Sequence, residues 1–167
     1  MRCSTNSRRS GFTLVEAMIA AAISALFLGS LFAINVSSMQ TIKMARESAA
    51  ASQVLQQRVE SMRIANWHQI TDADWIKANL LNSDAPGTVS LRSVSENLTV
   101  MPYGSGNTGT TQLNRQNGAA TISQRNDALL TENAIQIIWT VNYVGAPNEH
   151  PTTRQTVAIL GKGGVAK

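Results

Sequence analysis

The first feature of the chain is a long apolar segment near its N-terminus. Residues 17–36, AMIAAAISALFLGSLFAINV, contain no charged side chain, and Glu16 immediately precedes them. A helix rises 1.5 Å per residue, so these 20 residues would form a helix roughly 30 Å long, the thickness of a hydrocarbon core. The pattern therefore predicts a helix that can span a membrane once.

The helical pattern continues beyond the apolar segment. No proline interrupts the chain before Trp67, and Leu55, Val59 and Met62 recur at helical spacing. Polar residues fall between them, and Arg58 is expected on the polar side. We expect one helix over residues 12–65, whose second half supports a globular domain. A coiled coil is the alternative for that half, although its apolar positions do not sustain three or four heptads.

After Trp67 the pattern changes to shorter elements. Thr71 or Asp72 is a suitable N-cap for a short helix over residues 73–81, and NSDAPG follows as a turn. Alternation and β-branched residues then predict two strands, at residues 88–95 and 96–103.

The next segment, YGSGNTGTTQLNRQNG at residues 103–118, is rich in glycine and asparagine and is predicted to be a loop. Residues 133–144 predict the clearest strand of the chain. Its apolar side chains fall on one face, which we expect to cover the helix: Ile135, Ile137, Trp139, Val141 and Tyr143.

A turn over residues 145–151 separates this strand from TTRQTVAIL, residues 152–160. The two strands predict an antiparallel hairpin, in which Val157 and Ile159 alternate with Thr156 and Ala158. A long helix followed by antiparallel strands places the chain in the α+β class.

Charge places the N-terminus relative to the membrane. The formal net charge is +4, but Arg2, Arg8 and Arg9 precede the apolar segment, which leaves 11 basic against 10 acidic residues from Phe12 onward. The positive-inside bias predicts a cytoplasmic N-terminus and an outward C-terminal domain. A nearly neutral domain without a basic stripe gives no support for nucleic-acid binding. Because Cys3 is the only cysteine, no intrachain disulfide can form.

A cleaved secretory signal is an alternative reading of the N-terminus. The apolar segment exceeds the usual 7 to 15 residues, and Leu31 fits poorly at the small-residue position three before a cut after Ala33. Phe12 lies one residue too late for a twin-arginine signal, and Cys3 precedes the apolar segment, which does not match a lipoprotein.

The N-terminal residues RRSGFTLVEAMIA, 8–20, resemble the processing site of type IV prepilins and type II secretion pseudopilins. The resemblance extends over residues 1 to about 66. It implies cleavage after Gly11 by a prepilin peptidase, N-methylation of the new N-terminal Phe12 and a role for Glu16 in assembly.

The resemblance also implies a domain organisation. Residues 1–11 would be a cleaved basic leader, 12–36 a transmembrane and assembly helix, 37–66 its amphipathic continuation, and 67–167 a periplasmic α+β domain. The protein would cross the bacterial inner membrane once and join other pilin or pseudopilin subunits in a helical filament, through an inner-membrane assembly platform.

The apolar helix lacks proline, and Ala33 stands about where many major pilins carry one. The stretch ESAAASQVLQQRVESMR resembles the corresponding part of minor pilins and minor pseudopilins. The resemblance therefore favours a minor subunit. Its residues do not distinguish a type IV pilus, a secretion pseudopilus and a DNA-uptake pilus.

Glu16 also has a physical interpretation independent of the resemblance. A carboxylate at the centre of a membrane helix costs roughly 2.5 to 3.5 kcal/mol, so a functional role is the default hypothesis. In a filament, its natural partner is the amino group of Phe12 on a neighbouring chain. Alternatively, Glu16 reaches the interface and interacts with the helix dipole, because it lies one turn inside the helix.

The sequence does not predict an enzyme, a cofactor or a metal site. His68 and His150 are far apart, no nucleophile and base stand at a recognised spacing, and Asp72, Asp74 and Asp84 do not match the C-terminal calcium site of major pseudopilins.

Trp75 and Trp139 are expected in the core. Three classes of function stay open at this point: a filament subunit, a single-span anchored binding module and a secreted globular protein.

Overall fold

The computed structural model describes residues 13–104, 106, 109–146 and 150–163. It divides into two compact units, residues 1–41 and residues 42–167. The predicted ends of the leader, the membrane helix and the globular domain stay predictions.

Helix α1, Leu14–Ile64, is 51 residues long and confirms the predicted long helix. Its apolar residues up to residue 41 are exposed. Buried residues begin at Glu47 and recur along the second half of the helix, at Ala50, Ala51, Val54, Leu55, Arg58 and Met62. The prediction for Arg58 was wrong: it lies on the buried face, because residues 54, 58 and 62 are four apart and share one side of a helix.

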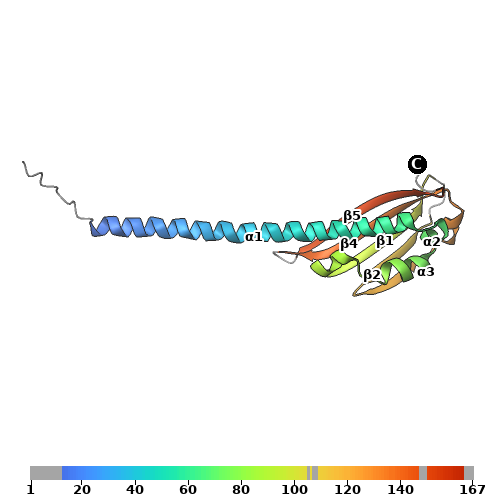
Figure 1. Cartoon of the computed structure of the whole chain (residues 1–167), viewed down its shortest axis with the longest axis horizontal. Helices are drawn as coiled ribbons and strands as arrows, with labels where there is room; N and C mark the ends of the chain where they lie inside the picture. The colour runs from blue at the N-terminus through green and yellow to red at the C-terminus, as the bar shows by residue number, and fades with distance from the viewer. Residues whose placement is uncertain (1–12, 105, 107–108, 147–149, 164–167) are drawn as a thin grey trace, which may run out of the picture. The chain divides into compact units, whose positions relative to one another are not determined.

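Five antiparallel strands form one sheet in the order β3-β2-β1-β4-β5 (Figure 1). Their bounds are Arg92–Pro102 for β1, Thr111–Gln116 for β2, Ala119–Gln124 for β3, Ala134–Gly145 for β4 and His150–Gly161 for β5. The second half of α1 lies along this sheet, and the predicted α+β class is confirmed.

Short helical segments connect α1 to the sheet. Helix α2, Trp67–Thr71, is followed by α3, Ala73–Ile76, which continues as the π-helical turn η1, Lys77–Leu81. The Asp72 side chain accepts a hydrogen bond from the Asp74 backbone N–H at 2.9 Å, so the predicted cap and the predicted helix over residues 73–81 are confirmed. Two further 3₁₀ turns occur, η2 at Pro86–Ser90 and η3 at Asp127–Thr131.

The predictions for residues 88–118 were wrong in two places. Residues 92–102 form one strand, β1, which passes the predicted boundary between residues 95 and 96 without a turn, whereas residues 88–90 belong to η2. Residues 111–116, predicted as loop, form β2, whose Leu113 and Arg115 are buried. Because β2 is rich in polar residues, its alternation of buried and exposed side chains was not recognised in the sequence. The alternation results from the pairing of β2 with β1.

The hairpin of β4 and β5 is confirmed, and Trp139, Ile137 and the other predicted apolar residues of β4 are buried. On β5, however, Val157 and Ile159 are 52% and 50% exposed, on the face opposite to Trp139. The register explains this orientation, because directly paired residues share a face and Trp139 pairs with Thr156.

Candidate functional site

The start of α1 is closed by reciprocal hydrogen bonds between Thr13 and Glu16. The carboxylate Oε2 of Glu16 accepts from the Thr13 backbone N–H and from its hydroxyl, both at 3.0 Å. The Thr13 hydroxyl in turn accepts from the Glu16 N–H at 3.3 Å. This is the geometry of a capping box, in which a threonine and a glutamate three residues later satisfy the free N–H groups of a helix start.

The helix that follows this cap presents apolar side chains on all sides. Leu14 is 79% exposed, and Leu26 and Phe32 are 75% and 72% exposed. The helix contains a window long and apolar enough to cross a membrane, and none of that window is buried within the protein. Glu16 is the only charged residue between Leu14 and Ile42, so a bilayer would surround an otherwise uncharged helix.

The predicted processing residues, Gly11 and Phe12, lie outside the described residues. Of the predicted site residues, the structure places Glu16, and it brings this residue together with Thr13, which the prediction did not include. The sequence carried the signal for this contact, because a threonine followed three residues later by glutamate before an apolar run is a capping-box pattern.

Residues 6–32 match the family model of the prokaryotic N-terminal methylation motif. The chain carries a prepilin-type N-terminus. The matched segment contains Gly11, Phe12, Thr13 and Glu16, and it indicates a protein of the type IV pilin or pseudopilin type. No curated protein and no solved structure is significantly similar to the chain.

The prepilin-type motif, the apolar helix and the small sheet together agree with a pilin-like protein. The motif implies processing by a prepilin peptidase and assembly with other pilin subunits in general, and the apolar helix indicates membrane anchoring.

A buried ionic cluster joins α1 to the sheet in the second unit. Glu96 on β1 is fully buried and accepts from Arg58 at 2.9 and 3.0 Å. Arg115 on β2 donates to Glu96 Oε1 at 3.0 Å, and the indole of Trp139 on β4 donates to Oε2 at 3.2 Å. Asp84, which is largely exposed, pairs with the other side of Arg115. The positive charges of Arg58 and Arg115 are thus balanced by the negative charges of Glu96 and Asp84.

Arg58 also binds η1 and the segment that follows it. It donates to the backbone carbonyls of Leu80 and Ser83, the latter at 2.8 Å. One guanidinium therefore connects the helix, the sheet and the connecting segment. The sequence pattern missed this cluster for two reasons. The residues bonded to Glu96 are 19 to 43 residues from it in the chain, and Arg58, Glu96 and Arg115 occupy buried positions that periodicity rules assign to apolar side chains.

A second contact joins α1 to the turn after β4. Buried Glu47 accepts from the backbone N–H of Ala146 at 2.9 Å. Nearby, Gly87 of η2 packs directly on α1: a Cβ at this glycine would lie 2.6 Å from the carbonyl oxygen of Ala50 and 2.8 Å from a methyl of Val54. These contacts set how closely η2 and the β4–β5 turn approach the helix.

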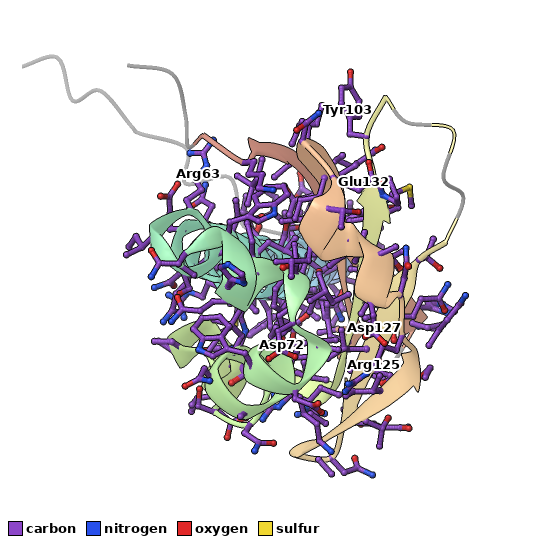
Figure 2. All side chains as sticks on the ribbon, turned by 90° about the vertical axis from the view of Figure 1, so that its right-hand side faces the viewer. Arg63, Asp72, Tyr103, Arg125, Asp127 and Glu132 are labelled. Atoms are coloured by element: carbon purple, nitrogen blue, oxygen red, sulfur yellow. The ribbon has the colours of Figure 1, made fainter. Side chains whose placement is uncertain are left out.

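The acidic residues considered for calcium each have a separate role. Asp72 caps α3, Asp74 pairs with Arg125, and Asp84 pairs with Arg115. Figure 2 shows Arg125 beside Asp127 at the same end of the unit as Asp72. The hydrogen bond that Arg125 donates to the Asp74 carboxylate raises the pKa of Arg125, and the charges of Asp74, Asp127 and Asp72 act in the same direction.

Among the described residues, His68, His150 and Trp75 do not form a further candidate binding site. His68 lies exposed in α2 and His150 lies exposed at the start of β5. Within the described ranges, no group of three His, Cys, Asp or Glu residues could hold a metal ion. Trp139 is fully buried as predicted, and Trp75 packs at the edge of the core.

Proposed function

We propose that this protein is a minor subunit of a type IV pilus or a type II secretion pseudopilus. In this proposal a prepilin peptidase cleaves after Gly11, the new amino group of Phe12 is methylated, and the C-terminal unit lies outside the inner membrane. The role is structural rather than enzymatic. The observation that carries the proposal is the methylation motif over residues 6–32, directly at the start of an exposed apolar helix.

The hydrogen bonds of Glu16 support a two-state role for its carboxylate. Before assembly, Thr13 holds the carboxylate at the helix start and lowers the cost of placing it in an apolar surrounding. In the filament, the amino group of Phe12 on a neighbouring subunit supplies the opposite charge. The bonds to Thr13 use the carboxylate oxygen Oε2, and in the part of the chain that the structure describes Oε1 has no hydrogen-bond partner, so we infer that Oε1 binds that amine.

The assignment as a minor subunit rests on the absence of proline from residues 14–64 and on the absence of a cysteine pair. Counting subunits in sheared filaments tests it. We expect this chain at a small fraction of the filament mass. A preparation in which it forms most of the mass would contradict the assignment to a minor subunit.

The N-terminus of the membrane-extracted protein separates the three classes of function. Mass spectrometry should find a chain that begins at methylated Phe12. An intact Met1 would instead support a single-span anchored binding module, and a start beyond residue 30 would support a secreted protein. Either of the last two results would reject the filament proposal.

A further inference from the structure

Strand β5 forms a long and regularly paired edge of the sheet. It is an edge strand, because β4 is the only strand that pairs with it among the described residues (Figure 1). All 12 of its residues, His150–Gly161, pair with β4 without a register shift. In an antiparallel pair, alternate residues direct their N–H and C=O groups to opposite sides of the strand. Roughly half of the backbone groups of β5 are therefore directed away from the sheet, where a further strand can pair with them.

The opposite edge of the sheet is less suited to such pairing. Strand β3, Ala119–Gln124, has only 6 residues, and the register of its pairing with β2 shifts between Gln112 and Leu113. Short edge strands and irregular pairing are two ways in which proteins prevent a sheet edge from binding another chain. Strand β5 has neither feature, and its only proline is its second residue, Pro151.

Charge does not protect this edge either. The only Lys, Arg, Asp or Glu residue of β5 is Arg154, which pairs with buried Val141 and therefore lies on the face of the sheet that carries α1. There it donates a hydrogen bond to the hydroxyl of Ser48 on α1. The opposite face of β5 has only uncharged residues: Pro151, Thr153, Gln155, Val157, Ile159 and Gly161. This face thus lacks the charged side chains that commonly protect an edge strand.

A small apolar patch on this face extends to the edge. Val157 and Ile159 are 52% and 50% exposed, and Val157 pairs directly with Ile138 of β4. Paired residues have Cβ atoms about 4.5 to 5.5 Å apart, and residues two apart in a strand share a face, so the three side chains are neighbours. A strand added beside β5 would cover this patch if it carried aliphatic side chains at alternate positions.

The edge specifies the chemistry of its occupant. A row of backbone donors and acceptors that repeats every two residues is complementary to another extended polypeptide. An ionised side chain placed against the patch would lose water without gaining a partner, because the adjoining face of β5 has no charge. The occupant is therefore an extended segment with uncharged side chains, some of them aliphatic.

The direction of α1 disfavours a second copy of this chain as the occupant. Ser48 contacts Arg154 near the start of β5, and Met62 lines a small cavity together with Leu160 near its end, so this part of α1 runs parallel to β5. Two β5 strands paired antiparallel would place the two Ile42 residues at opposite ends of the pair, roughly 30 Å or more apart. The apolar segments of the two chains would then continue from opposite ends, which does not suit insertion into one membrane.

We propose that β5 binds an extended, uncharged segment of a different subunit of the filament, which adds a strand to the sheet. This inference rests on the proposed function and adds to it the surface by which the second unit contacts a neighbouring subunit. Backbone hydrogen bonds hold the segment, and the patch of Val157, Ile159 and Ile138 selects aliphatic side chains in it.

The first test measures whether an extended peptide binds at this edge. The full chain in a neutral detergent is titrated with the fluorescently labelled peptide TTQQTVAIL, which is residues 152–160 with glutamine in place of Arg154. A matched peptide carries methyl groups on two adjacent central amides, which removes hydrogen-bond donors on both sides of the strand. We expect only the unmodified peptide to bind. It should protect amides of β5, but not of β3, from hydrogen exchange.

Variants of the chain then locate the peptide. Val157→Lys should weaken binding by about tenfold, because it removes an aliphatic contact and places a charge beside the added strand. Ile159→Lys should act in the same way and replaces Val157→Lys if that variant does not fold. Thr121→Lys adds the same charge at an exposed position of β3 and should bind the peptide normally. Normal binding by the β5 variants, or equal binding of the methylated peptide, would overturn the proposal.

The second test identifies the source of the bound segment. Entry into sheared filaments is measured for the unsubstituted chain, Val157→Lys and Thr121→Lys, and we expect only Val157→Lys to be depleted. Normal entry of Val157→Lys, or equal depletion of Thr121→Lys, would overturn the assignment to another subunit. A dimer of the purified chain that Val157→Lys dissociates would identify a second copy and would also overturn it. Absence of the unsubstituted chain from filaments would instead reject the proposed function itself.

Discussion

Arg58 of α1 and Glu96 of β1 form a buried, two-point ion pair, with N–O distances of 2.9 and 3.0 Å. The guanidinium also lies over the ring of Trp139, 5.8 Å from its centroid. A charge left alone at this position would have no access to water. The pair therefore makes the contact between helix and sheet sensitive to the loss of either member.

Replacing Arg58 by alanine should destabilise the folded second unit by about 3 to 5 kcal/mol, because Glu96 would keep a buried charge with fewer partners. Arg63→Ala is the matched control: it removes an exposed pair with Glu60 on the same helix and should cost less than about 1 kcal/mol. Thermal unfolding of the full chain in detergent, followed by tryptophan fluorescence, measures both. Similar melting temperatures for the two variants would contradict the burial of Arg58.

Trp139→Ala should also destabilise the fold by about 3 to 5 kcal/mol, because it removes a fully buried ring and one hydrogen-bond donor to Glu96. Val157→Ala on the neighbouring strand changes a side chain that is half exposed, and we expect it to cost less than about 1 kcal/mol. The midpoints of denaturant unfolding are compared for the Trp139→Ala and Val157→Ala variants. An unchanged midpoint for Trp139→Ala would place this ring on the surface.

Gly87→Ala should destabilise the contact between η2 and α1 by roughly 1 to 3 kcal/mol, since the new methyl would overlap the carbonyl of Ala50. At Gly106, where no atom lies within 4 Å of such a methyl, the same substitution should have little effect. Hydrogen exchange at the amides near Ala50 would locate the change. Equal protection of these amides from exchange in Gly87→Ala and Gly106→Ala would show that η2 moves away from α1 without a loss of stability.

Glu16→Ala should leave membrane insertion intact or improved, since it removes a costly group, and should prevent assembly. Glu16→Gln separates the two roles of the side chain, because the amide oxygen still accepts from Thr13 but carries no charge for a neighbouring amine. Incorporation into filaments and methylation of Phe12 are measured for both. If the Glu16→Gln variant enters filaments normally, the role of Glu16 is to cap the helix and not to pair with a charge. If the Glu16→Ala variant also enters filaments normally, assembly requires neither the cap nor the charge pair.

Replacing Gly11 by leucine should act at an earlier step and block cleavage, so that the arginine leader stays attached and no free Phe12 amine forms. Cleavage after Gly11 should continue in Glu16→Ala. Immunoblots of membrane fractions resolve the leader-bearing and processed chains. A Gly11→Leu chain that is processed normally would place the cleavage at another bond.

Elements with local patterns could be predicted from the order of the amino acids alone. The long helix, the cap at Asp72 and the buried face of β4 follow from the periodicity of adjacent side chains, and the structure has all three. The N-terminal motif is similarly local, because a peptidase reads consecutive residues. Thr13 and Glu16 are three residues apart, so their contact requires only helical geometry.

The burial of charge and the pairing of strands depend on contacts between residues that are distant in the sequence. Arg58 was expected on the polar side of its helix and Arg115 in a loop, yet both are buried, because Glu96, distant from both in sequence, pairs with each of them. Strand β2 exists because β1 offers an edge for its backbone, although its own composition is that of a loop. The orientation of Val157 likewise follows from its pairing with Ile138, since pairing across strands fixes which face a residue occupies, and no local pattern contains that information.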